Sequence, residues 1–268
     1  MADKTKAPVT PVKKPFLRGN ITDERTWKNA LGIFGILVIT AVMTFLVCSS
    51  LSMDPAWLRA VLNMAVELVV LMLFFHNAIG RGAEAVARGE ILWQKQEKGR
   101  EYAASEKAMC FHSGKGYLTA VIGTLPILIC AVILALTAQR QTTTAGTLPG
   151  WMDTYRRREE IGGALVAYTA STGLGLEDVL RMIVRISLMP FVAMVGAENR
   201  DGMLLLERLS PLLVLLPAGA YGTGYLQGIR ERSQIHTGIA ESNRKRVRRE
   251  KKARKARAAR NHGPEQLN

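Results

Sequence analysis

Four long apolar runs dominate the pattern of hydrophobic and polar positions along the chain. They cover residues 29–53, 60–80, 117–137 and 209–229 and contain a single charged side chain, that of Glu67 in the second run. A helix rises about 1.5 Å per residue, so about 20 apolar residues cross the roughly 30 Å hydrocarbon core of a bilayer. Soluble core helices of this length usually carry a charged face. The pattern therefore predicts an all-α, polytopic helical membrane protein with four secure transmembrane helices.

The distribution of Lys and Arg between the runs predicts how the protein is oriented. Seven of these residues precede the first run, none lies in the link around Asp54 and Pro55, seven lie in residues 81–116 and thirteen follow residue 229. Cytoplasmic segments of membrane proteins carry an excess of Lys and Arg. We therefore expect a multi-pass plasma membrane protein with both termini in the cytoplasm and an even number of spans.

Three segments flank or connect these runs on the expected cytoplasmic side. Residues 1–28 form a basic arm that we expect to be disordered, because its prolines oppose an amphipathic helix. Residues 81–116 form a loop whose first part, rich in Ala, Glu, Lys and Arg, is predicted to be helical. Residues 230–268 form a polybasic tail. The transmembrane domain itself is predicted to occupy residues 29–229.

Residues 138–203 leave the number of spans open between four and six. Residues 161–176 are diluted by glycines and hydroxyl side chains, and residues 178–197 contain two arginines and a proline. We favour four spans, with 138–203 as an extracytoplasmic or re-entrant segment. Glu177, Arg181 and Arg185 recur every four residues and so share one helix face. This spacing predicts an interfacial or partly inserted amphipathic helix at the outer face.

A polar stripe marks the second run, where Arg59, Asn63 and Glu67 also lie four residues apart. An unpaired carboxylate at the depth of Glu67 costs about 2.5–3.5 kcal/mol. In a four-span protein Arg181 or Arg185 descends from the outer face to a similar depth, so we expect a Glu67–Arg185 ion pair. A structural pair that fixes how two helices meet is favoured over a proton, ion or substrate pathway.

Small residues recur at a spacing of four in the last run. Ala218 and Gly222 form one row, and Ala220, Gly224 and Gly228 form another. Small residues at this spacing let helix backbones approach closely in a lipid environment, where the hydrophobic effect does not drive helices together. The pattern predicts a helix-packing surface, and flexibility for gating is the alternative.

Composition concentrates the charge of the chain near its C-terminus. The net charge of the 268 residues is +14, and residues 244–260 alone hold eleven Lys or Arg and one acid. Such a run attracts anionic lipid headgroups by about 1 kcal/mol per basic residue, and ribosomal RNA through counterion release. It has no aromatic residue for base stacking, so sequence-specific nucleic-acid binding is not expected. The predicted lipid- or RNA-binding residues are Arg244, Lys245, Arg246, Arg248, Arg249, Lys251, Lys252, Arg254 and Lys255.

The sequence contains no catalytic motif or cofactor-binding loop. Cys110 and His112 could approach His76, but they lack the paired spacing of a zinc site. We therefore expect no enzyme activity, cofactor or metal. The favoured function is a non-enzymatic membrane module whose tail binds anionic lipid or an acidic partner. The alternative is a transporter or insertase-like protein with a polar intramembrane site at Glu67 and Arg181 or Arg185 and a ribosome-binding tail.

Overall fold

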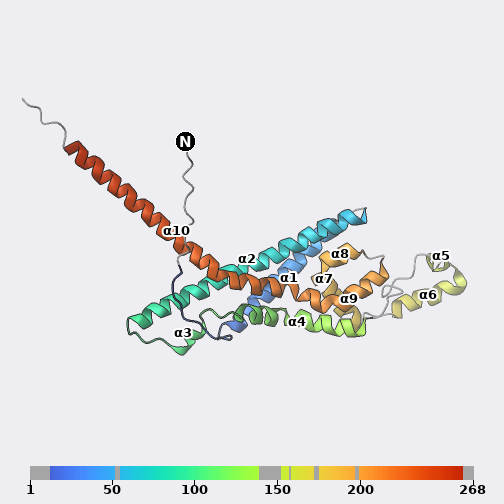
Figure 1. Cartoon of the computed structure of the whole chain (residues 1–268). Coiled ribbons are helices and arrows are strands. Elements are labelled where there is room, and N and C mark those ends of the chain that lie inside the picture. Colours follow the sequence, from blue (N-terminus) through green and yellow to red (C-terminus); the bar gives the residue numbers. More distant parts are fainter. Residues whose placement is uncertain are drawn as a thin grey trace, which may run out of the picture.

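The computed structural model describes residues 13–51, 55–138, 152–156, 158–171, 175–196 and 199–261, and these residues form helices and no strand. In chain order the helices are α1 (Thr26–Ser50), α2 (Ala56–Glu97), α3 (Ala104–Ala108), α4 (Lys115–Thr137), α5 (Asp153–Arg156), α6 (Glu159–Ser171), α7 (Leu176–Ser187), α8 (Met189–Val195), α9 (Arg200–Val214) and α10 (Leu216–Asn261). Figure 1 shows an elongated bundle from which α10 projects at one end.

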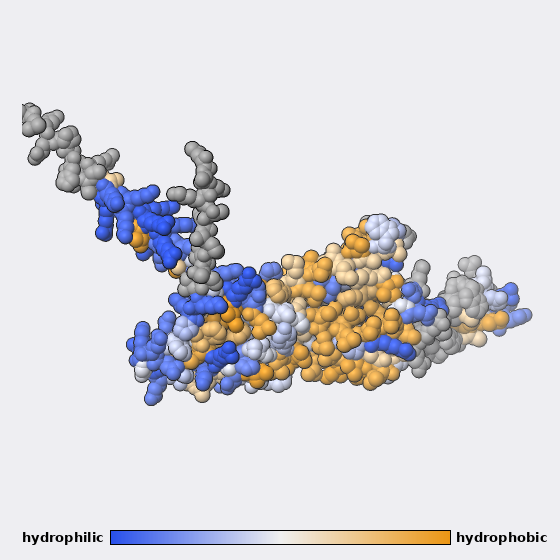
Figure 2. All heavy atoms as spheres, viewed as in Figure 1, coloured by the Kyte–Doolittle hydropathy of each residue, from blue (hydrophilic) through white to orange (hydrophobic). Residues whose placement is uncertain are grey.

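Four helical units are long and apolar enough to cross a bilayer: α1, α2, α4 and the pair α9–α10. The last apolar run is shared between α9 and α10, because the chain turns at Leu215 and Pro217 at the start of α10 has no N–H to donate. Many large apolar side chains of these helices are exposed, and they form the orange surface of Figure 2 between two blue ends. Such a surface is suited to lipid, and the prediction of an all-α polytopic membrane protein is confirmed.

The two ends of the bundle differ in composition, and we name them for the elements they contain. The tail end holds the described part of the arm, the start of α1, the second half of α2, the start of α4 and α10 beyond Ile229. The far end holds the end of α1, the end of α4 and the short helices α7 to α9 (Figure 1). The arm and the basic part of α10 therefore lie at the same end of the bundle.

Neither stretch that left the number of spans open is long enough to cross a bilayer. α6 has 13 residues and α7 has 12, which gives them lengths of about 20 and 18 Å against a core of about 30 Å. α7 packs against α1, α4 and α9, while α8 packs against α1 and α2. The four-span prediction is confirmed over the described residues. Residues 139–151, 172–174 and 197–198 lie outside them.

The arm differs from the disorder expected of residues 1–28. Residues 13–25 run along the tail end, where Leu17 N–H donates to the Gly89 carbonyl at 3.1 Å and Gly19 N–H donates to the Phe111 carbonyl at 2.9 Å. A Cβ on Gly89 would stand 2.6 Å from the Leu17 carbonyl oxygen, so glycine permits this approach. The arm is not helical before α1, but hydrogen bonds to neighbouring segments hold it in place. Residues 1–12 lie outside the described residues.

The most extensive helix contact joins α2 and α10, and glycines line it. Gly82 faces the Tyr225 carbonyl, Gly224 faces the Phe75 carbonyl, and Gly228 lies on the backbone of Gly82. At each glycine an added Cβ would overlap the facing backbone. The two helices therefore touch through their backbones, which is the kind of contact that the row of Gly224 and Gly228 predicts.

The remaining small residues of α10 face other neighbours. Gly222 lies against the ring of Tyr117 on α4, and Ala218 is 3% exposed within the hydrophobic core. Ala220 is half-buried against the same core. The two rows of small residues thus lie on different sides of α10, one toward α2 and one toward α4.

A valine at Gly82 is expected to destabilise the bundle, because its side chain would meet the backbone of α10. Overpacking of this kind costs about 1–3 kcal/mol or more. The measurement is thermal unfolding of the purified protein in detergent. Gly80→Val is the matched control, because Gly80 lies on the same helix with nothing within 4 Å of its Cβ position. Equal unfolding temperatures of the two variants would contradict the assigned contact.

Candidate functional site

A buried cluster of charges joins α7 to α9 at the far end. Glu207 of α9 is 2% exposed, and its Oε1 lies 2.9 Å from Arg181 Nε and 2.5 Å from Arg185 Nη2. Within α7, Arg181 also pairs with Glu177 at 2.7 Å and with Asp178 at 3.5 Å. Every charge in the cluster has an opposite charge beside it, so the cluster is a satisfied ion-pair network.

The expected Glu67–Arg185 pair is wrong. Arg185 turns to Glu207 because α7 packs against α1, α4 and α9, whereas Glu67 lies on α2. Sequence spacing suggested a similar depth for both residues but carried no information on their positions around the bundle. Glu207 was missed because it precedes the last apolar run. A helical stripe with Ser210 and Val214, which are buried on the same face of α9, could have revealed it.

The apolar side of α7 is divided between the core and the outer surface. Val184 is 1% exposed and Arg181 6%, so both are buried inside the bundle. Leu176, Met182 and Ile183 are exposed, and a lipid-facing helix requires such side chains outside. The predicted amphipathic helix is therefore present, and it turns its buried arginine inward to Glu207.

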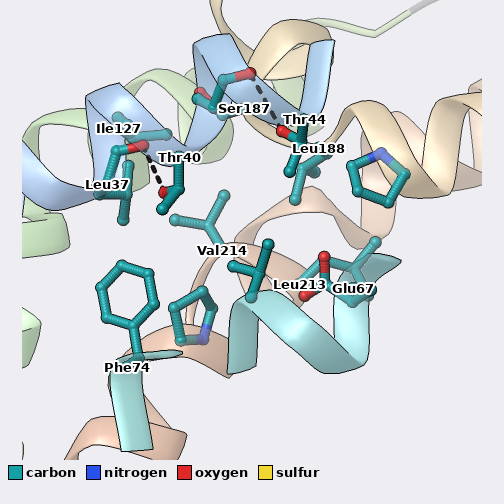
Figure 3. Close-up of a pocket in the computed structure, with 14 residues that line it drawn as sticks. Leu37, Thr40, Thr44, Glu67, Phe74, Ile127, Ser187, Leu188, Leu213 and Val214 are labelled. Carbon is teal, nitrogen blue, oxygen red and sulfur yellow. Dashed lines mark hydrogen bonds between the residues drawn. The ribbon is translucent and has the colours of Figure 1, made fainter. Parts of the chain in front are cut away.

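Glu67 of α2 lines a small cavity that residues of α1, α4 and the segment from α7 to α10 also line (Figure 3). Its side chain has no ion pair with any described residue. Thr40 and Thr44 line the opposite side, and their hydroxyls donate to the Leu37 and Ala41 carbonyls of their own helix at 2.9 and 3.0 Å. The cavity volume is about 30 Å³, and a water needs about 10–15 Å³. The site therefore has room for about two waters.

The other residues of the polar stripe on α2 do not line this cavity, and the buried Asn63 Oδ1 and Arg59 Nε have no hydrogen-bond partner among the described residues. Asn63 is fully buried, and its Nδ2 donates to the Arg59 carbonyl at 2.8 Å. The Arg59 guanidinium lies at the end of α8, where a Cβ on Gly196 would stand 2.7 Å from Nη2. The structure brings Arg181 and Arg185 together on Glu207 and places Glu67 in a separate cavity.

A second buried carboxylate, Glu90 of α2, binds two bases of α10 at the tail end. Its Oε2 lies 2.9 Å from Arg232 Nη2, and its Oε1 lies 2.8 Å from His236 Nε2. Arg232 and His236 are four residues apart and so face α2 together. Sequence analysis missed this cluster because Glu90 lies among other charged residues in a segment predicted to be a solvated helix.

A third buried carboxylate, Asp23, ties the arm to the start of α4. Asp23 lies 2.8 Å from Lys115 Nζ, and the Thr26 hydroxyl donates to it at 2.8 Å. Burial alone would raise the pKa of Asp23, but the bonds from Lys115 and Thr26 outweigh burial and hold the pKa below that of a free aspartate. Because the folded-state pKa is lowered, this pair stabilises the fold at neutral pH, and its contribution is lost as the pH falls through the lowered pKa.

The cysteine and the two histidines considered as metal ligands make other contacts, and the His76 ring lies edge-to-face against Phe75. Cys110 Sγ donates to the Glu106 carbonyl at 3.6 Å, and burial raises the pKa of this thiol, which favours its neutral form. His112 Nδ1 accepts a hydrogen bond from Gly114 N–H at 3.2 Å. No three His, Cys, Asp or Glu side chains among the described residues are grouped as metal ligands would be.

The predicted lipid- or RNA-binding residues, Arg244 to Lys255, lie in α10 and are exposed. Within this run Arg246 Nε lies 3.8 Å from Glu250. The run starts about 22 Å beyond Ile229 by helix rise. We call the segment from Arg244 to Arg257 the basic helix.

Comparison of the chain with models of known protein families, with curated proteins and with solved structures finds no match. The function is therefore argued from the arrangement of the charged residues described above. Among the described residues, Glu207, Glu90 and Asp23 each bind basic side chains of another segment, and one exposed basic helix extends from a four-span membrane bundle.

Replacing Glu207 with glutamine is expected to destabilise the protein strongly, because two guanidinium groups would lose their interhelical carboxylate. Removing one partner of a buried pair costs about 3–5 kcal/mol. The measurement is thermal unfolding in detergent. Glu67→Gln is the matched control, the same chemical change at a buried glutamate without an ion partner among the described residues, and it should change stability little. A larger loss for Glu67→Gln would show that the assignment of the two glutamates is reversed.

Proposed function

We propose that the protein is a non-enzymatic membrane module that holds the basic helix at the cytoplasmic face of the plasma membrane, where it binds anionic lipid headgroups. The observation that carries this proposal is the continuity of α10. It runs for 46 residues from the apolar span to Asn261 without a break. The basic residues are thus attached to the bundle through a helix rather than through a flexible linker.

The direction of α10 is fixed before it leaves the bundle. Its glycines lie directly on α2, and Glu90 binds Arg232 and His236 beyond the end of the span. A buried carboxylate with two charged or polar partners resists rotation, because any turn of the helix would leave it unpaired. Figure 1 shows the basic helix inclined to the long axis of the bundle, which brings it nearer the membrane plane than an axial helix would be.

The chemistry of the basic helix favours an anionic surface as its partner. Arg244 and Arg248, and Lys251 and Lys255, are like charges four residues apart, which repel one another on a helix. A neighbouring anion removes this repulsion. Headgroups of the bilayer that anchors α10 have a high effective concentration, whereas RNA has to be recruited from solution. We therefore favour the lipid surface, rather than a ribosome or another acidic partner, as the binding partner of the basic helix.

The orientation follows from the positive charge at the tail end. The described part of the arm, the second half of α2 and α10 beyond Ile229 all lie at this end, and these segments carry most of the Lys and Arg of the chain. The positive-inside bias then assigns both termini to the cytoplasm. In sealed inverted vesicles we expect added trypsin to remove the basic helix, and in right-side-out vesicles we expect mass spectrometry to find it intact. Removal in right-side-out vesicles would reverse the orientation and end the proposal of a cytoplasmic helix.

Binding of the basic helix to headgroups is expected to protect it from trypsin. We would reconstitute the full chain in nanodiscs of phosphatidylcholine alone or with about 30% phosphatidylglycerol, a content at which the surface attracts polybasic segments. The rate of cleavage within Arg244–Arg257 should fall severalfold in the anionic nanodiscs. About 0.5 M NaCl should restore cleavage, because it shortens the Debye length well below its physiological value of about 8 Å.

Cleavage at the exposed turn of Lys98 and Arg100, which lies in the same nanodisc, is the internal control and should be less affected. Equal cleavage of the basic helix in both nanodiscs would overturn the lipid proposal. Protection by added ribosomes but not by anionic lipid would assign the helix to that partner instead.

A further inference from the structure

A groove at the tail end is lined by basic residues that are not part of the basic helix. It lies between the arm, the second half of α2 and the part of α10 around Ile229, and its volume is about 720 Å³. Pockets that bind small organic ligands measure about 300–1,000 Å³. The basic side chains that line the groove are Lys13, Lys14, Arg18, Arg230, Arg232 and His236.

The charge of this groove is positive and unbalanced. Its one acidic lining residue, Glu90, already binds Arg232 and His236. Lys13, Lys14, Arg18 and Arg230 are exposed and form no ion pair with a described residue. Four cations around one concave surface attract an anion, and a phosphate group accepts hydrogen bonds from both Lys and Arg.

The groove also has an apolar side that joins the membrane-spanning surface. Leu226 and Ile229 are 37% and 39% exposed, and both belong to the last apolar run. Phe16 and Val86 extend the apolar lining. A free phosphate has no apolar part that could contact this side of the groove. A nucleic acid would have to displace lipid at the membrane boundary in order to reach it. A molecule with a phosphate at one end and hydrocarbon at the other matches both sides.

The arm that carries three of the cations is already held in place. Leu17 and Gly19 hydrogen-bond through their backbones to α2 and to the segment before α4, and Asp23 binds Lys115. These bonds flank Arg18 and follow Lys14. A ligand therefore meets a largely formed site, which lowers the entropic cost of binding.

We propose that this groove binds one anionic phospholipid, with its phosphate among Lys14, Arg18 and Arg230 and an acyl chain along Leu226 and Ile229. This site is distinct from the basic helix. The basic helix is proposed to bind the headgroup surface as a whole, whereas the groove lies at the boundary of the span and binds a single lipid molecule.

The test is native mass spectrometry of the full chain in detergent with equal amounts of phosphatidylglycerol and phosphatidylcholine. The wild-type protein should retain one phosphatidylglycerol in preference to phosphatidylcholine. The triple variant Lys14→Gln, Arg18→Gln and Arg230→Gln should lose this preference by about tenfold or more, because each basic group contributes to headgroup attraction. The matched control, Lys98→Gln, Arg100→Gln and Lys107→Gln, removes the same charge from exposed positions outside both the groove and the basic helix and should keep the preference.

A second measurement does not depend on the variants. Phosphatidylglycerol should raise the unfolding temperature of the wild-type protein more than phosphatidylcholine does, because a ligand that binds only the folded state stabilises it. Glycerol phosphate, which lacks acyl chains, should not. No preference in the wild type, equal retention by both triple variants, or equal stabilisation by glycerol phosphate would each overturn the proposal. Failure of the basic helix to bind nanodiscs would leave these results unchanged, so the two proposals can fail separately.

Discussion

The backbone contact between α2 and α10 is the interaction on which the tail end depends. In a bilayer the hydrophobic effect does not press helices together, so close packing and buried polar bonds must do so. Gly82 and Gly228 remove the side chains that would separate the two helices. This approach lets Glu90 bind Arg232 and His236, and these bonds set the direction in which α10 continues. The groove lies beside these bonds, where residues of α2, α10 and the arm line it together.

Buried carboxylates perform the same physical task at both ends of the bundle. Glu207 at the far end, and Glu90 and Asp23 at the tail end, each bind a base on a different segment. Glu67 in the middle has only a cavity of about 30 Å³ beside it. A pathway for a solute needs a larger, connected polar space. The charges of the described bundle therefore favour a role in fixing helices over a role in transport.

The sequence predicted the features that depend on local composition. The four spans follow from uninterrupted apolar length, and the close-packing surface of α10 follows from the spacing of its small residues, although the sequence did not identify α2 as the partner of this surface. Ion-pair partners were not predictable in the same way. Whether Arg185 can reach Glu67 or Glu207 depends on which helices α7 packs against, and the sequence pattern does not show this. The sequence wrongly predicted a disordered arm over residues 13–25. The arm is held by backbone hydrogen bonds, such as that of Leu17 to Gly89, and such bonds do not require a recognisable pattern of side chains.

The groove and the basic helix lie on one helix but differ in what they can recognise. The first residue of the basic helix, Arg244, lies about 21 Å along α10 from Arg230 in the groove, well beyond the Debye length of about 8 Å in physiological salt. An anion in the groove therefore changes the electrostatic attraction of the basic helix very little. Any coupling between them has to be mechanical, through the angle at which α10 leaves α2. A lipid in the groove would affect the basic helix by stabilising that angle, since it contacts both the arm and α10.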